Sequence, residues 1–282
     1  MANSKKIAAT NEVAANFESS NDLSEVSLSR DSLLIYLKDK ALAEKAFCFK
    51  TLASTNTTAK EMADNGSPSG TTVVADAQTA GRGRFSRTFY SPGGSGLYIS
   101  FILDSDADLS FIVAASVAAV CVVLEKVCEI SPRIKWVNDV FVDGRKVAGI
   151  LAEAKLGKSG KPQWVVLGIG INITSANFPP ELEGVAGALF PSGAPSSLRS
   201  RLAAALMDEF LSSSGWMDRK TALYEYRKRA LFIGERILIK KPHSEECAIA
   251  VSLDDDLRLV VRKDDGTEEA LLWGEVSVRA AR

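Results

Sequence analysis

The sequence contains few of the residues on which many catalytic and metal sites depend. Histidine occurs once, at His243, in a polar stretch that we expect to be exposed to solvent. The four cysteines include no pair separated by two residues, which is the spacing typical of zinc sites and redox motifs. Buried free thiols in a reducing compartment explain these cysteines best. Histidine triads, histidine-rich metal sites and disulfide frameworks are therefore poor interpretations of this chain.

Segments that target a protein or cross a membrane are also scarce. The longest apolar run, residues 109–124, is interrupted by two serines and is shorter than the ~18 to 20 residues of a spanning helix. We interpret it as a buried helix. The first residues lack the apolar core of a secretory signal, and acidic residues between positions 12 and 25 argue against a transit peptide. We therefore expect a cytoplasmic protein.

A strong excess of one charge is missing as well. Lysine and arginine number 34, aspartate and glutamate 35, and the net charge is −1. No general attraction to nucleic acid or to a membrane surface is expected from such a balance. The length of 282 residues suffices for one sizeable core and a small additional domain. Binding of an anion would have to depend on a local cluster of basic side chains.

One stretch does concentrate glycine and arginine. Between Gly81 and Gly96 the chain carries five glycines, together with Arg82, Arg84 and Arg87. Glycine lets the backbone approach a ligand closely, and arginine offers planar paired donors to phosphate or carboxylate. The stretch predicts a clamp for a phosphate-bearing molecule. Taken alone, a mobile basic surface loop explains it equally well.

Strand-like and helical patterns alternate through most of the chain. β-Branched and aromatic residues predict strands, and longer apolar patterns predict helices. The expected strands cover residues 46–49, 71–75, 97–103, 140–142, 146–154 and 164–172. The expected helices cover residues 33–37, 57–63, 109–127, 197–211 and 217–230. Asp31-Ser32 is expected to cap the first helix, and Asp143-Gly144 predicts a tight hairpin turn.

Three regions follow from this pattern. Residues 1–28 contain few large apolar groups, so we expect a disordered tail. Residues 29–230 form the main α/β unit. In residues 231–282 the pattern changes to period two, which predicts a small all-β domain. Its expected strands cover residues 236–239, 248–253, 257–262 and 270–278.

Polar residues also cluster outside the glycine and arginine stretch. Residues 135–139 combine a lysine, a tryptophan, an asparagine and an aspartate, Lys146 begins an apolar strand, and Asn172 ends a strand that contains glycines. Each has an ordinary explanation as a turn or a solvated strand end. In functional terms, lysine suits phosphate, asparagine suits a base or ribose, and Asp139 suits Mg²⁺ or an arginine of the loop. Their joint occurrence in one chain favours a binding site.

These motifs, in this order, resemble those of biotin protein ligases, also called biotin–carboxylase ligases or holocarboxylase synthetases. The resemblance extends over residues 47–278 and depends on the whole set of motifs. The motifs are Ser54-Thr55-Asn56, Gln78, Gly81-Arg82-Gly83-Arg84, Ser91-Pro92, Gly96-Leu97-Tyr98, Lys135-Trp136-x-Asn138-Asp139, Arg145-Lys146-x-Ala148-Gly149-Ile150-Leu151-x-Glu153, Gly168-x-Gly170-Ile171-Asn172 and Gly274-Glu275-Val276.

The resemblance implies an α+β fold and a two-step reaction. A mixed-sheet catalytic domain of the biotin/lipoate ligase type, similar to class II synthetases, would precede a C-terminal SH3-like β-barrel. Biotin would be activated by ATP, with Mg²⁺, as biotinyl-5′-AMP and then transferred to a lysine of a biotin carboxyl carrier protein domain. The rate would come from charge stabilisation and positioning. A homodimer is compatible with the family, and neither nucleic acid nor membrane is an expected partner.

The resemblance also implies a role for each matching residue. Biotin would be bound by Ser54, Thr55, Asn56, Gln78, Gly81, Arg82, Gly83, Arg84, Lys146 and Gly149. The nucleotide would be bound by Arg82, Arg84, Arg87, Phe89, Lys135, Asn138, Lys146 and Asn172. Lys146 and Arg84 would be the catalytic residues, and Asp139 would be the candidate ligand of the metal.

Three positions depart from the family pattern. Ser86 replaces a glycine of the loop, Val137 replaces a proline, and Phe89 replaces a tryptophan that covers adenine. We expect altered loop mobility or adenine affinity from these changes. A sensor that binds biotin without catalysing its transfer also fits them.

Two further interpretations stay open. A lipoate or octanoate ligase has the same fold, and fold alone does not separate it from a biotin ligase. A biotin-sensing transcriptional regulator would need a DNA-binding domain, but residues 1–53 show no recognition helix with clustered basic residues. We therefore expect a form without such a domain.

Overall fold

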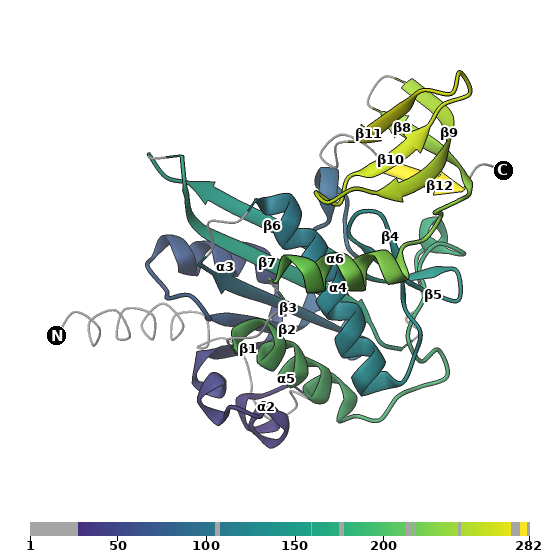
Figure 1. The fold of residues 1–282 in the computed structure, drawn as a ribbon. Coiled ribbons are helices and arrows are strands. Elements are labelled where there is room, and N and C mark those ends of the chain that lie inside the picture. Colours follow the sequence, from purple (N-terminus) through teal and green to yellow (C-terminus); the bar gives the residue numbers. More distant parts are fainter. Residues whose placement is uncertain are drawn as a thin grey trace.

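The computed structural model describes residues 28–104, 108–158, 160–174, 178–212, 216, 218–241, 244–271 and 277–280. These residues form two β-sheets of different size, with helices packed on the larger one (Figure 1). Apart from Leu28, the expected tail lies outside the described residues. His243 and the motif at residues 274–276 lie outside them too.

The larger sheet has seven strands in the order β1-β2-β3-β7-β6-β5-β4. The strands are β1 (Ala46–Leu52), β2 (Thr72–Gln78), β3 (Gly96–Leu103), β4 (Arg133–Lys135), β5 (Asp139–Val142), β6 (Arg145–Leu156) and β7 (Pro162–Asn172). β1 and β2 run parallel, and the other neighbouring pairs are antiparallel. The mixed sheet predicted from the sequence is confirmed.

Helices cover the two faces of this sheet unequally. The helices are α2 (Arg30–Tyr36), α3 (Thr55–Asp64), α4 (Leu109–Cys128), α5 (Leu198–Leu211) and α6 (Arg219–Arg229), with short 3₁₀ turns η2 (Lys40–Lys45), η3 (Arg84–Ser86) and η4 (Pro180–Leu182). Along β3, Ile99 and Phe101 belong to the core that includes α4 and α5, whereas Ile102 belongs to a smaller cluster with Met62 of α3. Because side chains alternate along a strand, α3 lies on the face opposite α4 and α5.

The apolar run expected to be a buried helix is α4. Asp108 accepts a hydrogen bond from the backbone N–H of Ser110, and Glu129 ends the helix in the left-handed conformation. By length and hydropathy α4 resembles a membrane-spanning helix, but 67% of its most apolar stretch is buried inside the protein. Ile112 and Leu124 are fully buried there. The interpretation as a core helix is confirmed, with the end one residue later than predicted.

The predicted hairpin is also confirmed. β5 and β6 pair in antiparallel register, and the turn between them places Asp143 at φ 49° and Gly144 at φ 74°. Aspartate and glycine tolerate this left-handed conformation better than other residues. The turn therefore sets the position of Lys146 at the start of β6.

Two local expectations are wrong. The cap of the first helix is Ser29, whose Oγ accepts a hydrogen bond from the backbone N–H of Ser32 in a reciprocal capping box, so Asp31-Ser32 lies inside the first turn. The strand expected from residue 257 begins at Leu259, because Leu257 adopts φ 59°. Of the strand expected over residues 270–278, residues 272–276 lie outside the described residues; one strand ends at Leu271 and another begins at Ser277.

The smaller sheet is antiparallel, with the order β11-β10-β9-β8-β12. Its strands are β8 (Arg236–Lys241), β9 (Ser244–Leu253), β10 (Leu259–Arg262), β11 (Glu268–Leu271) and β12 (Ser277–Ala280). Ile237, Ile239 and Val261 are fully buried within it. The sequence thus predicted a small β domain correctly, and we keep residues 231–282 as its proposed extent.

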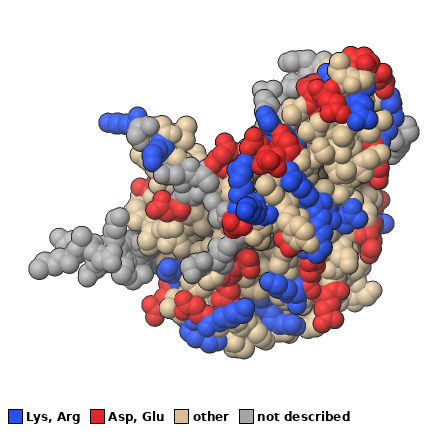
Figure 2. All heavy atoms as spheres, in the orientation of Figure 1, with Lys and Arg blue, Asp and Glu red and all other residues tan. Residues whose placement is uncertain are grey.

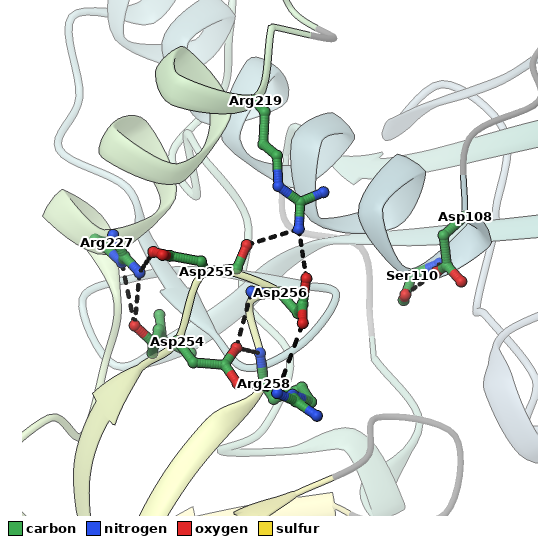
Figure 3. A network of polar contacts seen from close by, with 9 residues as sticks. Asp108, Ser110, Arg219, Arg227, Asp254, Asp255, Asp256 and Arg258 are labelled. Atoms are coloured by element: carbon green, nitrogen blue, oxygen red, sulfur yellow. Dashed lines mark hydrogen bonds and ion pairs between the residues drawn. The ribbon is translucent and has the colours of Figure 1, made fainter.

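The smaller sheet is attached to α6 and to the Trp136 segment. Arg219 donates to the backbone oxygen of Asp255 over 2.8 Å, and Arg227 donates to that of Leu253 over 2.9 Å (Figure 3). The indole N–H of Trp136 donates to the backbone oxygen of Leu257 over 3.0 Å. Basic and acidic side chains lie side by side over this face of the molecule (Figure 2).

Candidate active site

A cavity of about 470 Å³ opens on the α3 face of the larger sheet. Segments far apart in the chain line it: the start of α3, the loop after β2, the β4–β5 turn, β6, β7 and the segment after β7. All residues predicted to bind biotin, nucleotide or metal line this cavity, with the exception of Gly81. They are Ser54, Thr55, Asn56, Gln78, Arg82, Gly83, Arg84, Arg87, Phe89, Lys135, Asn138, Asp139, Lys146, Gly149 and Asn172.

Glycines of β6 and β7 form the floor of the cavity. An added Cβ at Gly168 would lie 1.9 Å from Asn56 Oδ1, and one at Gly170 would lie 2.6 Å from the Phe89 ring. At Gly149 the nearest atom would be Lys146 Cε, at 3.2 Å. The alternation of β7 turns Gly168 and Gly170 toward the cavity and turns their neighbours into the core. Close packing of side chains therefore requires glycine on this face.

Gly81 does not line the cavity but holds the loop in its folded conformation. Its backbone oxygen accepts from the N–H of Phe89 over 2.9 Å. A Cβ there would lie 2.3 Å from the backbone oxygen of Phe89 and 2.6 Å from Ser91 Oγ. Gly81 thus closes the loop that carries Arg82, Arg84 and Arg87 back onto itself.

One end of the cavity is a neutral hydrogen-bonded network. Gln78 Oε1 accepts from the backbone N–H of Thr55 over 2.8 Å, and Gln78 Nε2 donates to Ser91 Oγ over 2.9 Å. Ser100 Oγ lies 2.8 Å from Thr55 Oγ1 and 2.7 Å from Asn56 Oδ1. The hydroxyl of Ser54 makes no capping bond to α3. Hydrogen bonds within the protein thus hold the side chains of Thr55, Asn56 and Gln78 in place before a ligand arrives.

The protein occupies both ends of the Asn56 amide, as it does for Gln78, but one partner of Asn56 is a charged carboxylate. Its Oδ1 lies against Ser100, and its Nδ2 donates to Glu153 Oε2 over 3.0 Å. Glu153 in turn receives Lys60 Nζ at 2.7 Å. Burial by itself raises the pKa of Glu153, but the hydrogen bonds from Lys60 and Asn56 hold that pKa below its ordinary value. Asn56 is therefore a strut between α3, β3 and β6.

Sequence reasoning missed the residues behind this strut. Glu153 belongs to a quoted motif, but no role was predicted for it, and Lys60 and Ser100 were not singled out. Lys60 follows Asn56 by four residues on a helix, which places both side chains on one face. Ser100 is the one serine within an otherwise largely apolar strand. These two signals were available in the sequence, although their partners were not.

The other end of the cavity is strongly basic. Six basic side chains line the cavity, at positions 82, 84, 87, 135, 146 and 240, against the single carboxylate of Asp139. Lys146 Nζ lies 2.6 Å from Asp139 Oδ1, and Arg84 Nη1 donates to Asn138 Oδ1 over 3.2 Å. Burial lowers the pKa of Arg84, and the Asp139 carboxylate opposes this effect. Such a charge pattern suits a ligand that carries several negative charges.

The backbone around Lys146 is held by the segment that follows β7. The N–H of Lys146 donates to Val185 over 2.9 Å, and the N–H of Gly187 donates to the oxygen of Lys146 over 2.8 Å. Asn172 Nδ2 then donates to the oxygen of Gly187 over 3.0 Å. This arrangement fixes the point from which the Lys146 side chain extends into the cavity.

Two phenylalanines of the glycine and arginine loop occupy different positions. The Phe89 ring packs over Gly170 and meets Tyr98 edge-on, with ring centres 6.4 Å apart. Burial raises the pKa of Tyr98 to about 12. Phe85 lines the cavity at φ 55° with 54% of its surface exposed, and the Arg84 guanidinium lies 4.8 Å from its ring. Phe89 therefore lies in the wall and Phe85 at the mouth.

The segment with Trp136 is anchored at two points outside the cavity. The Trp136–Val137 peptide bond is cis. The hydroxyl of the buried Tyr226 donates to the backbone oxygen of Val137 over 3.0 Å. Together with the bond from Trp136 to Leu257, this contact fixes the segment that presents Asn138 and Asp139 to the cavity.

The site offers little for a dedicated metal cage. Among the described residues, no three or more histidine, cysteine, aspartate or glutamate side chains come together to hold a metal ion. Asp139 is the carboxylate of the cavity, and it is already paired with Lys146. One carboxylate fits an ion such as Mg²⁺ that takes most of its remaining ligands from water and substrate phosphates.

Comparison with known proteins agrees with this geometry. The sequence model of the biotin/lipoate A/B protein ligase family matches residues 48–172. The chain is 33% identical over 200 residues to the biotin–acetyl-CoA-carboxylase ligase of Mycobacterium tuberculosis, a match that covers 67% of this chain and 72% of that protein. The chain belongs to the biotin protein ligase family. This outcome confirms the resemblance inferred from the motifs.

Further relatives of the family extend the comparison. The bifunctional ligase/repressor BirA of Bacillus subtilis is 40% identical over 167 residues, which cover 57% of this chain and 51% of that protein. The chain thus spans about half the length of this curated relative. The structure of biotin protein ligase from Aquifex aeolicus in complex with biotin and ATP has a TM-score of 0.66 at 27% identity, covering 84% of this chain and 99% of that one.

Proposed function

We propose that this chain is an ATP-dependent ligase that activates biotin as biotinyl-5′-AMP and transfers it to a lysine of a biotin carboxyl carrier protein domain. One observation carries the proposal: a single cavity is lined by a neutral hydrogen-bonded network around Thr55 and Gln78 and by six basic side chains. Biotin has a neutral ureido group at one end and a carboxylate at the other. The Aquifex aeolicus relative was crystallised with biotin and ATP.

In the first step two anions must meet. A carboxylate oxygen of biotin attacks the α-phosphorus of ATP, the bond from that phosphorus to the β-phosphate bridge breaks, and pyrophosphate leaves. Lys146 and Arg84 enter the basic end of the cavity, where their charge offsets the repulsion and stabilises the charge that grows in the transition state. To do this, the Lys146 ammonium would leave its ion pair with Asp139 and form one with the ligand.

In the second step an amine replaces the phosphate. The lysine amine of the acceptor attacks the acyl carbon, the bond from that carbon to the phosphate oxygen breaks, AMP leaves, and the amine loses a proton. No enzyme nucleophile is needed. The chain contributes by holding the reactants in line and by excluding water.

The two ends of the cavity divide the binding of biotin and nucleotide. Ser54, Thr55 and Gln78 would bind the ureido group, with Asn56 as their strut and Gly149 beneath the rings. Arg82, Gly83 and Arg84 would close over the junction, with Gly81 shaping the loop. The residues proposed for the nucleotide are Arg82, Arg84, Arg87, Phe89, Lys135, Asn138, Lys146 and Asn172.

Magnesium would accompany ATP. When bound with ATP, the ion would supply charge neutralisation for the phosphates. Asp139 is the side chain of the cavity that would hold it, and Lys146 leaves Asp139 available once Lys146 turns to the ligand. The protein partner would be an acceptor domain of a carboxylase in the cytoplasm, and we propose neither nucleic acid nor membrane as a partner. A homodimer remains part of this proposal.

Mass spectrometry of an acceptor domain tests the proposal. The domain is incubated with this protein, biotin and Mg-ATP, beside the variants Lys146→Ala, Arg84→Ala and Lys155→Ala. Lys155 lies on the same strand as Lys146 but pairs with Asp64 outside the cavity, so it is the matched control. We expect a biotin-sized mass gain with the parent and Lys155→Ala, and a loss of at least about 100-fold in rate with Lys146→Ala.

Other outcomes would point to the alternatives. Transfer of lipoate in preference to biotin would replace the proposed substrate. Binding of biotin and ATP without any mass gain would leave a sensor of biotin as the function.

A further inference from the structure

The cavity receives one residue from the smaller sheet. Among the described residues beyond position 186, Lys240 of β8 alone lines it. The smaller sheet reaches this position because the N–H of Leu231 donates to the oxygen of Ile134 over 2.7 Å, and because Trp136 is bonded to Leu257. Both contacts place the smaller sheet beside β4 and the β4–β5 turn (Figure 1). Lys240 therefore approaches from the side that carries Lys135 and Asp139.

The alternation of β8 explains why Lys240 faces outward. Ile237 and Ile239 are fully buried in the smaller sheet, so the residues between and after them, Leu238 and Lys240, lie on the other face. Lys241 returns to the inner face, where its Nζ lies 2.7 Å from Glu246 and 3.3 Å from Glu269. Two adjacent lysines thus have different surroundings.

The surroundings of Lys240 suit reversible binding of a ligand. Its Nζ forms an ion pair with Glu245, directly across the β8–β9 hairpin, and both side chains are more than a third exposed. An exposed pair of this kind contributes little to stability, so exchanging Glu245 for a stronger anion costs little. Lysine on a flexible stem binds phosphate as a point charge.

We infer that Lys240 binds the β- and γ-phosphates of the nucleotide and that Glu245 holds it when the cavity is empty. The inference rests on the proposed function and adds a residue of the second sheet to it. Lys146 and Arg84 already serve the junction of carboxylate and α-phosphate. The two outer phosphates carry most of the charge of ATP, and Lys240 brings a further cation from the smaller sheet.

Binding of ATP and of AMP separates this role from others. Calorimetry on the full chain compares the parent with Lys240→Ala, Lys241→Ala and Glu245→Gln, after thermal melting has shown which variants fold. Lys240→Ala should weaken ATP binding about tenfold, as loss of one charged hydrogen bond does, and leave AMP binding unchanged. Lys241→Ala, with the same loss of charge, should leave both unchanged. Glu245→Gln should tighten ATP binding, because it releases Lys240.

A second readout uses the reaction. Lys240→Ala should raise the KM for ATP in pyrophosphate release and leave the transfer from preformed biotinyl-5′-AMP unchanged, because that intermediate has no outer phosphates. Equal ATP affinity in Lys240→Ala and the parent would overturn the inference. An equal loss for AMP, or an equal effect of Lys241→Ala, would overturn it too. If the parent binds ATP but releases no pyrophosphate, the proposed function fails, and the comparison of ATP with AMP still decides the role of Lys240.

Discussion

The two ends of the cavity are built in opposite ways. At the neutral end, the backbone N–H of Thr55 donates to Gln78, and the buried hydroxyl of Ser100 bonds to the side chains of both Thr55 and Asn56. At the basic end, Lys146 pairs with Asp139 and Lys240 pairs with Glu245, and these side chains are partly exposed. A buried network can hold a single arrangement, whereas exposed pairs exchange partners readily. We therefore expect the neutral end to select the shape of a ligand and the basic end to adapt to its charge.

The largest loss of ligand affinity is expected from a substitution at Gly168, where the neutral end has no space for an added side chain. Gly168→Ala would place a Cβ 1.9 Å from Asn56 Oδ1, and Asn56 cannot move without losing Ser100 and Glu153. We expect a loss of biotin affinity of about 100-fold and a loss of about 1–3 kcal/mol in the free energy of unfolding. Biotin calorimetry and urea denaturation measure both quantities. Gly157→Ala at the hairpin tip is the control, since its nearest atom lies 3.2 Å away on the Gln163 side chain. Unchanged biotin binding in Gly168→Ala would contradict the rigid network.

A smaller effect is expected when the strut itself is weakened. Glu153→Ala leaves the Asn56 Nδ2 only its long 3.5 Å contact with the backbone oxygen of Leu151, so the KM for biotin should rise about tenfold while the KM for ATP stays constant. Glu153→Gln keeps an acceptor oxygen for Asn56 and should restore most of the affinity for biotin. Steady-state kinetics with each substrate varied in turn provide the measurement. A rise in both KM values would show that the two ends are not independent.

The charge of Glu153 also predicts a dependence of stability on pH. Its folded-state pKa lies below the ordinary value of 4.5. A lowered carboxyl pKa contributes stability above the unfolded-state pKa, and this contribution is lost as pH falls through the folded-state pKa. The difference in unfolding free energy between the parent and Glu153→Gln should therefore be full at about pH 7 and shrink below pH 4.5. Urea denaturation at a series of pH values measures it, and a difference that grows in acid would refute the assignment.

The smallest effect is expected at the exposed contacts between α6 and the smaller sheet. Arg219 and Asp256 are both more than half exposed, and Arg219 also donates to the backbone of Asp255. Arg219→Ala should lower the unfolding free energy by about 0–1 kcal/mol and leave the KM for ATP within twofold. Thermal melting and kinetics check the two expectations. A large rise in the KM for ATP would mean that this contact positions the wall that carries Lys240.

Much of the scaffold could be predicted from local patterns. The β-branched and apolar runs of β6 and β7, the Asp143-Gly144 turn and the apolar run of α4 each determine structure through neighbours in the chain, and all three predictions are confirmed. The capping prediction is wrong because serine and aspartate both cap helices, and the sequence offers several of them in succession. In the structure the helix begins one residue after Ser29, which is the cap. Patterns of this kind identify an element more reliably than its first residue.

The site was predictable as a set of residues but not as a set of contacts. The residues next to Asn56 in the sequence do not reveal that its amide is hydrogen-bonded to Ser100 and Glu153. Nor does the sequence show that Phe89 lies in the wall of the cavity while Phe85 lies at its mouth. Lys240 was missed because its role depends on how the smaller sheet lies against the larger one. Such facts depend on distances between segments that are far apart in the sequence.

Isotope exchange between pyrophosphate and ATP tests the central claim most directly. The protein is mixed with Mg-ATP and labelled pyrophosphate, with biotin, with lipoate or with neither. The account predicts that label enters ATP when biotin is present, and that Lys146→Ala loses the exchange while Lys155→Ala keeps it. Exchange without biotin, or exchange that lipoate supports better than biotin, would contradict the claim that this cavity activates biotin.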